Sequence, residues 1–134
     1  MKVLLVDDST TIRMMLKGLL KQLQIVDVVE AGDGLEALTK LESEKVDLVL
    51  LDLHMPHMDG LAFLAEMRRR PALAHLPAVV ISSDTGPEQT ARAMELGVVA
   101  TIRKPFRLDS LKAAVDATLV SQAPQAAPAE APKP

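Results

Sequence analysis

Short apolar runs alternate along the chain with segments whose apolar residues recur at helical spacing, and this alternation constrains the fold most. The runs predict five strands, over Val3–Val6, Ile25–Val29, Val46–Leu51, Ala78–Ile81 and Val98–Ile102. The intervening segments predict helices, one with a buried face of Ile12, Met15, Leu16, Leu19, Leu20 and Leu23, and others over Leu35–Leu41, Leu61–Met67, Glu88–Leu96 and Leu108–Leu119. Such alternation implies right-handed crossovers and a mostly parallel sheet covered on both faces. The predicted class is a doubly wound α/β domain.

Residues typical of helix ends stand where these helices are predicted to begin and end. They are Ser9, Asp33 with Glu36, and Asp59 as caps, Pro87 at a first helical position, and Gly97 just past a helix. The run Arg68–Arg70 suits the negative end of a helix dipole. Four methionines at helical positions are expected to fill the core: Met14, Met15, Met67 and Met94.

The apolar runs also predict which strands are central. VDLVLL and AVVIS are apolar on both faces, as strands inside a parallel sheet are, whereas IVDVVE carries Asp27 and Glu30. We therefore expect the first, third and fourth strands at the centre of the sheet and the second at an edge.

Composition bounds the domain organisation and the class of partner. The chain has 134 residues, and 49% of them are hydrophobic, which is enough for the core of one domain. Residues 1–120 are the predicted domain, and the Ala- and Pro-rich residues 121–134 are a predicted flexible tail or linker. With a net charge of -3, the chain is not expected to bind nucleic acid directly. Without Cys and without an apolar stretch of about 20 residues, a cytoplasmic protein with no membrane segment is expected.

Polar side chains end four of the apolar runs: Asp7 and Asp8 the first, Asp52 the third, Ser82 the fourth and Lys104 the fifth. Ligands of open parallel sheets bind beyond the carboxyl ends of the strands, so these residues are expected at one rim. Three carboxylates together resist full ionisation unless a cation offsets them, and Mg²⁺ prefers hard oxygen ligands. We therefore predict that Asp7 and Asp8 form part of a Mg²⁺ seat and that Asp52 is a nucleophile for a phosphoryl group. Ser82 and Lys104 are predicted to bind the phosphoryl oxygens.

This ordered set resembles the receiver domain of two-component response regulators, as found in single-domain regulators of the chemotaxis type. The resemblance spans roughly residues 2–120, with motifs at Asp7-Asp8, at Asp52-Leu-His-Met-Pro-His-Met-Asp-Gly60, at Ser82-Ser83 and at Lys104-Pro105-Phe106. It implies a flavodoxin-like (βα)5 fold with five parallel strands in the order 2-1-3-4-5. It further implies phosphorylation of Asp52, with Mg²⁺ bound directly by Asp8, mainly through water by Asp7, and by the backbone carbonyl of His54. Ser82 and Lys104 then contact the phosphoryl oxygens, and the Lys104–Pro105 peptide bond is cis.

The implied role is that of a signalling switch rather than an enzyme. A histidine kinase or a histidine phosphotransfer protein would phosphorylate Asp52, and an output protein would read the face formed by the fourth helix, fifth strand and fifth helix. The resemblance fits a monomer or a phosphorylation-dependent dimer. Thr101 departs from the family, which usually has an aromatic switch residue three positions before the lysine, so coupling to the output face is expected to be altered. His54 and Asp84 stand where the family tunes the lifetime of the phosphoryl group.

Two other functions remain open from the residues. A Mg²⁺-dependent phosphatase of the haloacid dehalogenase type also uses a strand-end Asp, but it places a second Asp where this chain has His54. A receiver-like docking module that ignores phosphorylation is compatible with Thr101, although the acidic set, Ser82 and Lys104 argue against it. His54 and His57 have no Cys partners and are expected to be solvated rather than to bind a metal.

Overall fold

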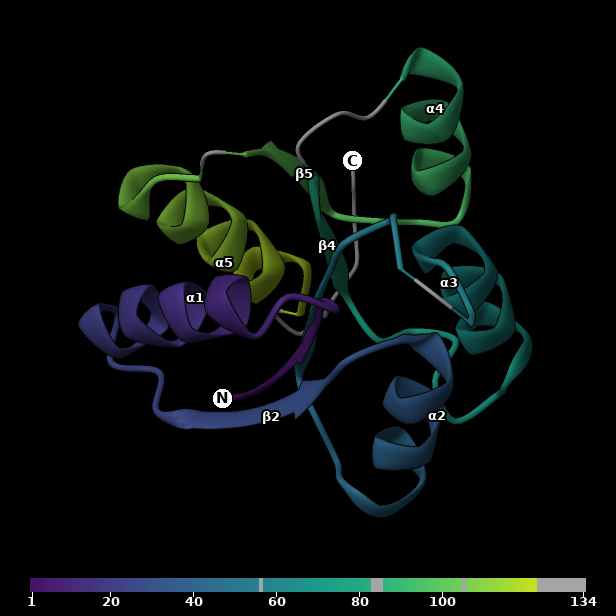
Figure 1. Cartoon of the computed structure of the whole chain (residues 1–134), viewed down its shortest axis with the longest axis horizontal. Helices are drawn as coiled ribbons and strands as arrows, with labels where there is room; N and C mark the ends of the chain where they lie inside the picture. The colour runs from purple at the N-terminus through teal and green to yellow at the C-terminus, as the bar shows by residue number, and fades with distance from the viewer. Residues whose placement is uncertain (56, 83–85, 105, 123–134) are drawn as a thin grey trace.

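The computed structural model describes residues 1–55, 57–82, 86–104 and 106–122, with the backbone alone described for Ser82 and residues 119–122. Five strands form one parallel sheet in the order β2-β1-β3-β4-β5 (Figure 1). The strands are β1 (Lys2–Val6), β2 (Asp27–Ala31), β3 (Leu48–Leu51), β4 (Ala78–Ser82) and β5 (Ala100–Arg103). The helices are α1 (Thr10–Gln22), α2 (Gly34–Ser43), α3 (Gly60–Arg69), α4 (Pro87–Glu95) and α5 (Leu108–Gln122). The predicted doubly wound class and the strand order are confirmed.

Helices cover both faces of the sheet: α1 and α5 lie on one side, and α2, α3 and α4 lie on the other (Figure 1). Along β1, Val3 and Leu5 pack into the cluster that includes Leu16 of α1 and Leu111 of α5. The alternate residues Leu4 and Val6 pack into the second cluster, whose largest side chain is Phe63 of α3. Side chains that alternate between two apolar layers explain why the central strands have no polar face.

The edge position predicted for the second strand is confirmed, although β2 begins two residues later than expected. The Ile25 N–H bonds to the Leu20 carbonyl, and Gln24 has a positive φ of 69°. These residues therefore close helix α1 before the chain enters the sheet, and the ladder starts at Asp27 opposite Lys2. An apolar residue in a helix-closing turn cannot be told from a strand residue by hydrophobicity alone.

The predicted helix ends are confirmed. The side chains of Ser9, Asp33 and Asp59 accept hydrogen bonds from backbone N–H groups of α1, α2 and α3. Pro87 is the first residue of α4, and Gly97 has a φ of +82°, which only glycine adopts readily. Each cap provides a partner for an otherwise unpaired helix-end group.

The predicted burial of the methionines is wrong for three of the four. Met67 is fully buried in the core beneath α3, but Met14, Met15 and Met94 are more than half exposed. The buried stripe of α1 runs through Leu16 and Leu20, and Met15 lies beside this stripe rather than on it. None of the described helices has both the length and the apolar character needed to cross a bilayer. Most of the predicted tail, residues 123–134, lies outside the described residues, so the domain boundary at residue 120 stays a prediction.

Candidate metal centre

Sheet register brings Asp7 and Asp52 together at the carboxyl ends of neighbouring strands. The Asp7 N–H donates to the Ala31 carbonyl at 3.1 Å, and the Asp52 N–H donates to the Val6 carbonyl at 2.9 Å. Both residues therefore extend the sheet hydrogen bonding one position beyond the assigned strands. These hydrogen bonds place both residues at one rim of the sheet.

Asp8 completes an acidic cluster with these two residues. Ligand oxygens of Asp7, Asp8 and Asp52 all lie within 4.8 Å of one another. Asp7 and Asp52 are only 3% and 7% exposed, whereas Asp8 is exposed to solvent. The cluster therefore has a buried floor and one carboxylate on the solvent side.

Lys104, which follows β5, brings a positive charge to the buried floor. Its Nζ lies 3.3 Å from Asp7 Oδ2 and 3.6 Å from Asp52 Oδ2, and its side chain is 15% exposed. An ammonium shared by two buried carboxylates offsets part of their mutual repulsion. Three carboxylates and one ammonium leave the cluster with an excess of negative charge, which favours a cation.

Burial raises the pKa of the Asp7 carboxyl above its ordinary value. The Ser9 N–H, which donates to Asp7 Oδ1 at 2.9 Å, and the charge of Lys104 lower the same pKa, whereas the charge of Asp52 raises it. Desolvation is the largest of these effects. Asp7 is thus an ionisable group whose charged form is costly unless further positive charge arrives.

The donor set fits Mg²⁺. All the side-chain donors are carboxylate oxygens, which hard divalent cations prefer, and the exposed Asp8 leaves a side of the site open to water. His54 stays at the cluster through its backbone, because its N–H donates to Asp52 Oδ1 at 3.2 Å. His54 as a residue is exposed to solvent.

Gly60 allows α3 to begin against the backbone of Asp52. Its N–H donates to the Leu53 carbonyl at 2.9 Å. A Cβ at this position would lie 2.6 Å from the Asp52 carbonyl oxygen and 2.6 Å from the Leu53 Cα. Any side chain larger than hydrogen would therefore push the helix away from the residue that the sequence predicts as the nucleophile.

Several predicted site features lie partly or wholly outside the described residues. The Ser82 backbone pairs with Arg103 at the end of β4, which places it at the same rim, but its side chain is not described. Asp84 and the Lys104–Pro105 bond also lie outside the described residues. Thr101 is exposed on β5 and lines a hollow of about 340 Å³ between β5 and α5.

The contacts of three residues were not predicted from the sequence; His57 and Arg13 lie near the site, and Arg68 lies at the far end of α3. His57, 69% exposed in its side chain, pairs with the cap Asp33 through Nδ1 and Oδ2 at 2.8 Å. Arg13 contacts the Asp7 carbonyl oxygen and Glu30. Arg68 does more than interact with a helix dipole, because it donates to backbone carbonyls far beyond its own helix. The position of Arg68 could have been inferred from helical spacing, because it stands four residues after the buried Leu64 and so on the inner side of α3.

Comparisons with known proteins agree with this geometry. Residues 3–116 match the family model described as the response regulator receiver domain. The chain is 40% identical over 116 residues to chemotaxis protein CheY-3 of Vibrio cholerae, which covers 87% of this chain and 89% of that protein. It is 35% identical to chemotaxis protein CheY of Pseudomonas aeruginosa, over 87% of this chain and 94% of that protein.

Among solved structures, the chemotaxis response regulator CheY4 of Vibrio cholerae superposes with a TM-score of 0.79 at 31% identity. The match covers 87% of this chain and 97% of that one. The motif spacing, the strand order and these matches lead to one conclusion: this chain belongs to the response regulator receiver domain family.

Proposed function

We propose that this chain is a Mg²⁺-dependent phosphoacceptor that receives a phosphoryl group on Asp52 from a phosphohistidine of a kinase or phosphotransfer protein. The observation that carries the proposal is the position of Asp52, buried at the carboxyl end of β3, with Asp7, Asp8 and Lys104 around it. A buried carboxylate between an ammonium and a cation-binding group is suited to attack on an anionic donor.

Asp8 and Asp52 would hold the metal directly, Asp7 mainly through water, and the backbone carbonyl of His54 would be a further ligand. The bound ion would supply positive charge that offsets the charge on the phosphoryl oxygens. Asp7 would gain from this charge, because its carboxylate is already costly to keep ionised. The residues would thus bind the ion and be stabilised by it.

In the transfer step, a carboxylate oxygen of Asp52 attacks phosphorus while the bond from phosphorus to the donor imidazole nitrogen breaks. The electron pair of that bond leaves with the imidazole. The Lys104 Nζ lies 3.6 Å from Asp52 Oδ2 and can donate a hydrogen bond to one oxygen of the bound phosphoryl group. Ser82 would donate a hydrogen bond to another phosphoryl oxygen. Attack by water on phosphorus later restores the Asp52 carboxylate and releases phosphate, so the signal is transient.

The same proposal covers partners and output. The phosphorylated domain, residues 1–120, would act in the cytoplasm as a monomer or as a phosphorylation-dependent dimer. Its α4, β5 and α5 face would be read by an output protein. Thr101 lies on that face and has no ring to turn inward, so the response to the phosphoryl group would pass through the backbone after β4 rather than through an aromatic switch.

Incubation with phosphoramidate or acetyl phosphate and Mg²⁺ tests the proposal. Intact-mass spectrometry is expected to show one added phosphoryl group on the wild-type chain, and none without Mg²⁺ or on Asp52→Asn. An unmodified wild-type chain, or equal modification of Asp52→Asn, would contradict the proposal. Catalytic release of phosphate from a phosphomonoester would instead favour a phosphatase.

A further inference from the structure

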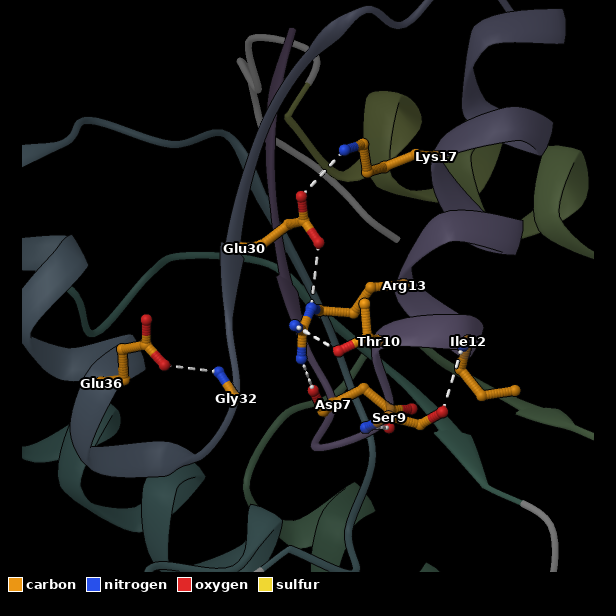
Figure 2. Close-up of polar contacts among 9 residues, drawn as sticks. All are labelled: Asp7, Ser9, Thr10, Ile12, Arg13, Lys17, Glu30, Gly32 and Glu36. Carbon is orange, nitrogen blue, oxygen red and sulfur yellow. Dashed lines mark hydrogen bonds and ion pairs between the residues drawn. The ribbon is translucent and has the colours of Figure 1, made fainter.

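Arg13 connects the metal-ligand loop to the edge of the sheet, as Figure 2 shows. One of its terminal nitrogens donates to the Asp7 carbonyl oxygen, and its Nε lies 2.9 Å from Glu30 Oε1 on β2. We propose that Arg13 is a positioning residue that orients the Asp7–Asp8 peptide so that both carboxylates meet one divalent cation. This inference rests on the proposed function.

The Asp7 carbonyl lies where the sheet hydrogen bonding stops. The Asp7 N–H still bonds to Ala31, the last residue of β2, but β2 does not continue. In a parallel ladder the next donor to the Asp7 carbonyl would be the N–H of Asp33, but Asp33 lies beyond β2 and is already the N-cap of α2. The Gly32 N–H between them donates to Glu36 Oε1 at 2.8 Å (Figure 2). The guanidinium of Arg13 therefore supplies a donor to a carbonyl that has passed the end of its neighbouring strand.

The orientation of this carbonyl matters because a peptide unit is planar. The Asp7 carbonyl and the Asp8 nitrogen belong to the same plane, so a bond to the carbonyl oxygen also sets the direction in which the chain enters Asp8. The Asp7 side chain has its own support from the Ser9 N–H and Lys104. Asp8 is exposed, so the peptide that precedes it is the principal control on where its carboxylate points.

Arg13 is itself well held. Its side chain is 16% exposed, and another of its nitrogens lies 3.3 Å from Thr10 Oγ1. Glu30 is fixed from its other oxygen by Lys17 at 2.9 Å. Hydrogen bonds from Lys17 and Arg13 lower the pKa of Glu30, so this carboxylate stays charged at neutral pH. The planar fork of a guanidinium can bond to a carboxylate and a carbonyl at once, which a lysine ammonium does less well.

The test compares Mg²⁺ affinity in Arg13→Ala, Arg13→Lys and the control Lys17→Ala, by isothermal titration of the unphosphorylated full chain. Lys17 lies on the same helix and contacts the same Glu30, but the structure gives it no bond to the Asp7 loop. Removing a group that orients metal ligands typically weakens metal binding by about tenfold or more. We therefore expect Arg13→Ala to raise the Kd for Mg²⁺ by about tenfold, Arg13→Lys to recover part of the loss, and Lys17→Ala to keep the wild-type Kd.

A wild-type Kd in Arg13→Ala, or an equal loss in Lys17→Ala, would overturn the role of Arg13 while leaving the proposed function intact. A wild-type chain that binds no Mg²⁺ would overturn both. If Arg13→Ala does not fold, Arg13→Gln replaces it, since the amide keeps one neutral donor. A wild-type Kd in Arg13→Gln would also count against the inference, because one amide cannot reach both Asp7 and Glu30 in the same way.

Discussion

The Lys104 ammonium lies 3.3 Å from Asp7 Oδ2, although 97 positions separate the two residues in the chain. This contact joins the end of β5 to the end of β1 across β3 and β4, and it places a fixed positive charge beside the buried carboxylate. It explains how the buried carboxylates Asp7 and Asp52 can lie close together in the folded chain.

Asp7→Asn is expected to stabilise the metal-free protein at neutral pH. Because burial raises the pKa of Asp7, the folded chain binds a proton here more tightly than the unfolded chain does. This tighter proton binding stabilises the wild-type fold at low pH, and the stabilisation is lost as the pH rises through the folded-state pKa of Asp7. The amide of the variant does not titrate and so loses nothing. The free energy of unfolding of the variant should exceed that of the wild-type chain by on the order of 1 kcal/mol at pH 7.5, and this difference should shrink towards pH 4. Thermal melts in EDTA at both values check this, and a lower Tm at pH 7.5 would contradict it.

Mg²⁺ is expected to raise the Tm of the wild-type chain, since a ligand that binds only the folded state stabilises it. The gain is about 2.7 kcal/mol when free Mg²⁺ is about a hundred times its Kd. Asp8→Asn should abolish this response, whereas Asp116→Asn, an exposed Asp on α5, should keep it. Melting curves over a Mg²⁺ titration measure the effect. An unchanged response in Asp8→Asn would remove Asp8 from the ligand set.

Gly60→Ala is expected to destabilise the fold and to slow phosphorylation. The new Cβ would meet the Asp52 carbonyl oxygen and the Leu53 Cα at 2.6 Å, and overpacking of this kind costs about 1–3 kcal/mol. Gly18→Ala is the matched control, because it lies inside α1, and the added carbon would have no atom within 4 Å apart from its chain neighbours and the backbone of its own helix. It should stabilise by about 0.5–1 kcal/mol. Urea denaturation measures both variants, and a Gly60→Ala variant as stable as wild type would show that α3 can shift freely.

Arg68→Ala is expected to lower the free energy of unfolding by about 3 kcal/mol, because several half-buried carbonyls lose a charged hydrogen-bond donor at once. The guanidinium donates to Leu96 at 2.6 Å and to Leu76 at 2.7 Å, with longer bonds to Ala74 and Gly97. It thus ties the end of α3 to the chain before β4 and to the end of α4. Urea denaturation of Arg68→Ala gives the cost directly.

The neighbouring arginine provides the control for that variant. The Arg69 side chain is 78% exposed and pairs only with Glu66 among the described residues, at 3.0 Å. Arg69→Ala should therefore change stability by less than about 0.5 kcal/mol. Equal losses in the two variants would show that helix propensity, not the carbonyl contacts, accounts for the effect.

The amino-acid sequence predicted the fold class and the residues that meet in the acidic cluster, because both depend on local patterns. The central and edge positions of the strands followed from which runs were apolar on both faces, whereas the full strand order came from the resemblance to receiver domains. Asp7, Asp8, Asp52 and Lys104 were found because each ends or follows a predicted strand. Met15 was placed wrongly because helical spacing defines a stripe only to within about one position. The start of β2 was misplaced for a related reason, since Ile25 is apolar but closes a helix.

Only the tertiary structure decided which charged groups pair. That Arg13 connects Asp7 to Glu30, that Arg68 gathers distant carbonyls and that Lys104 lies between two carboxylates depends on helix rotation and sheet register. Rotation and register are set by how apolar surfaces far apart in the chain pack together. A long charged side chain reaches whatever that packing brings within its range, so its partner cannot be found from neighbouring residues alone.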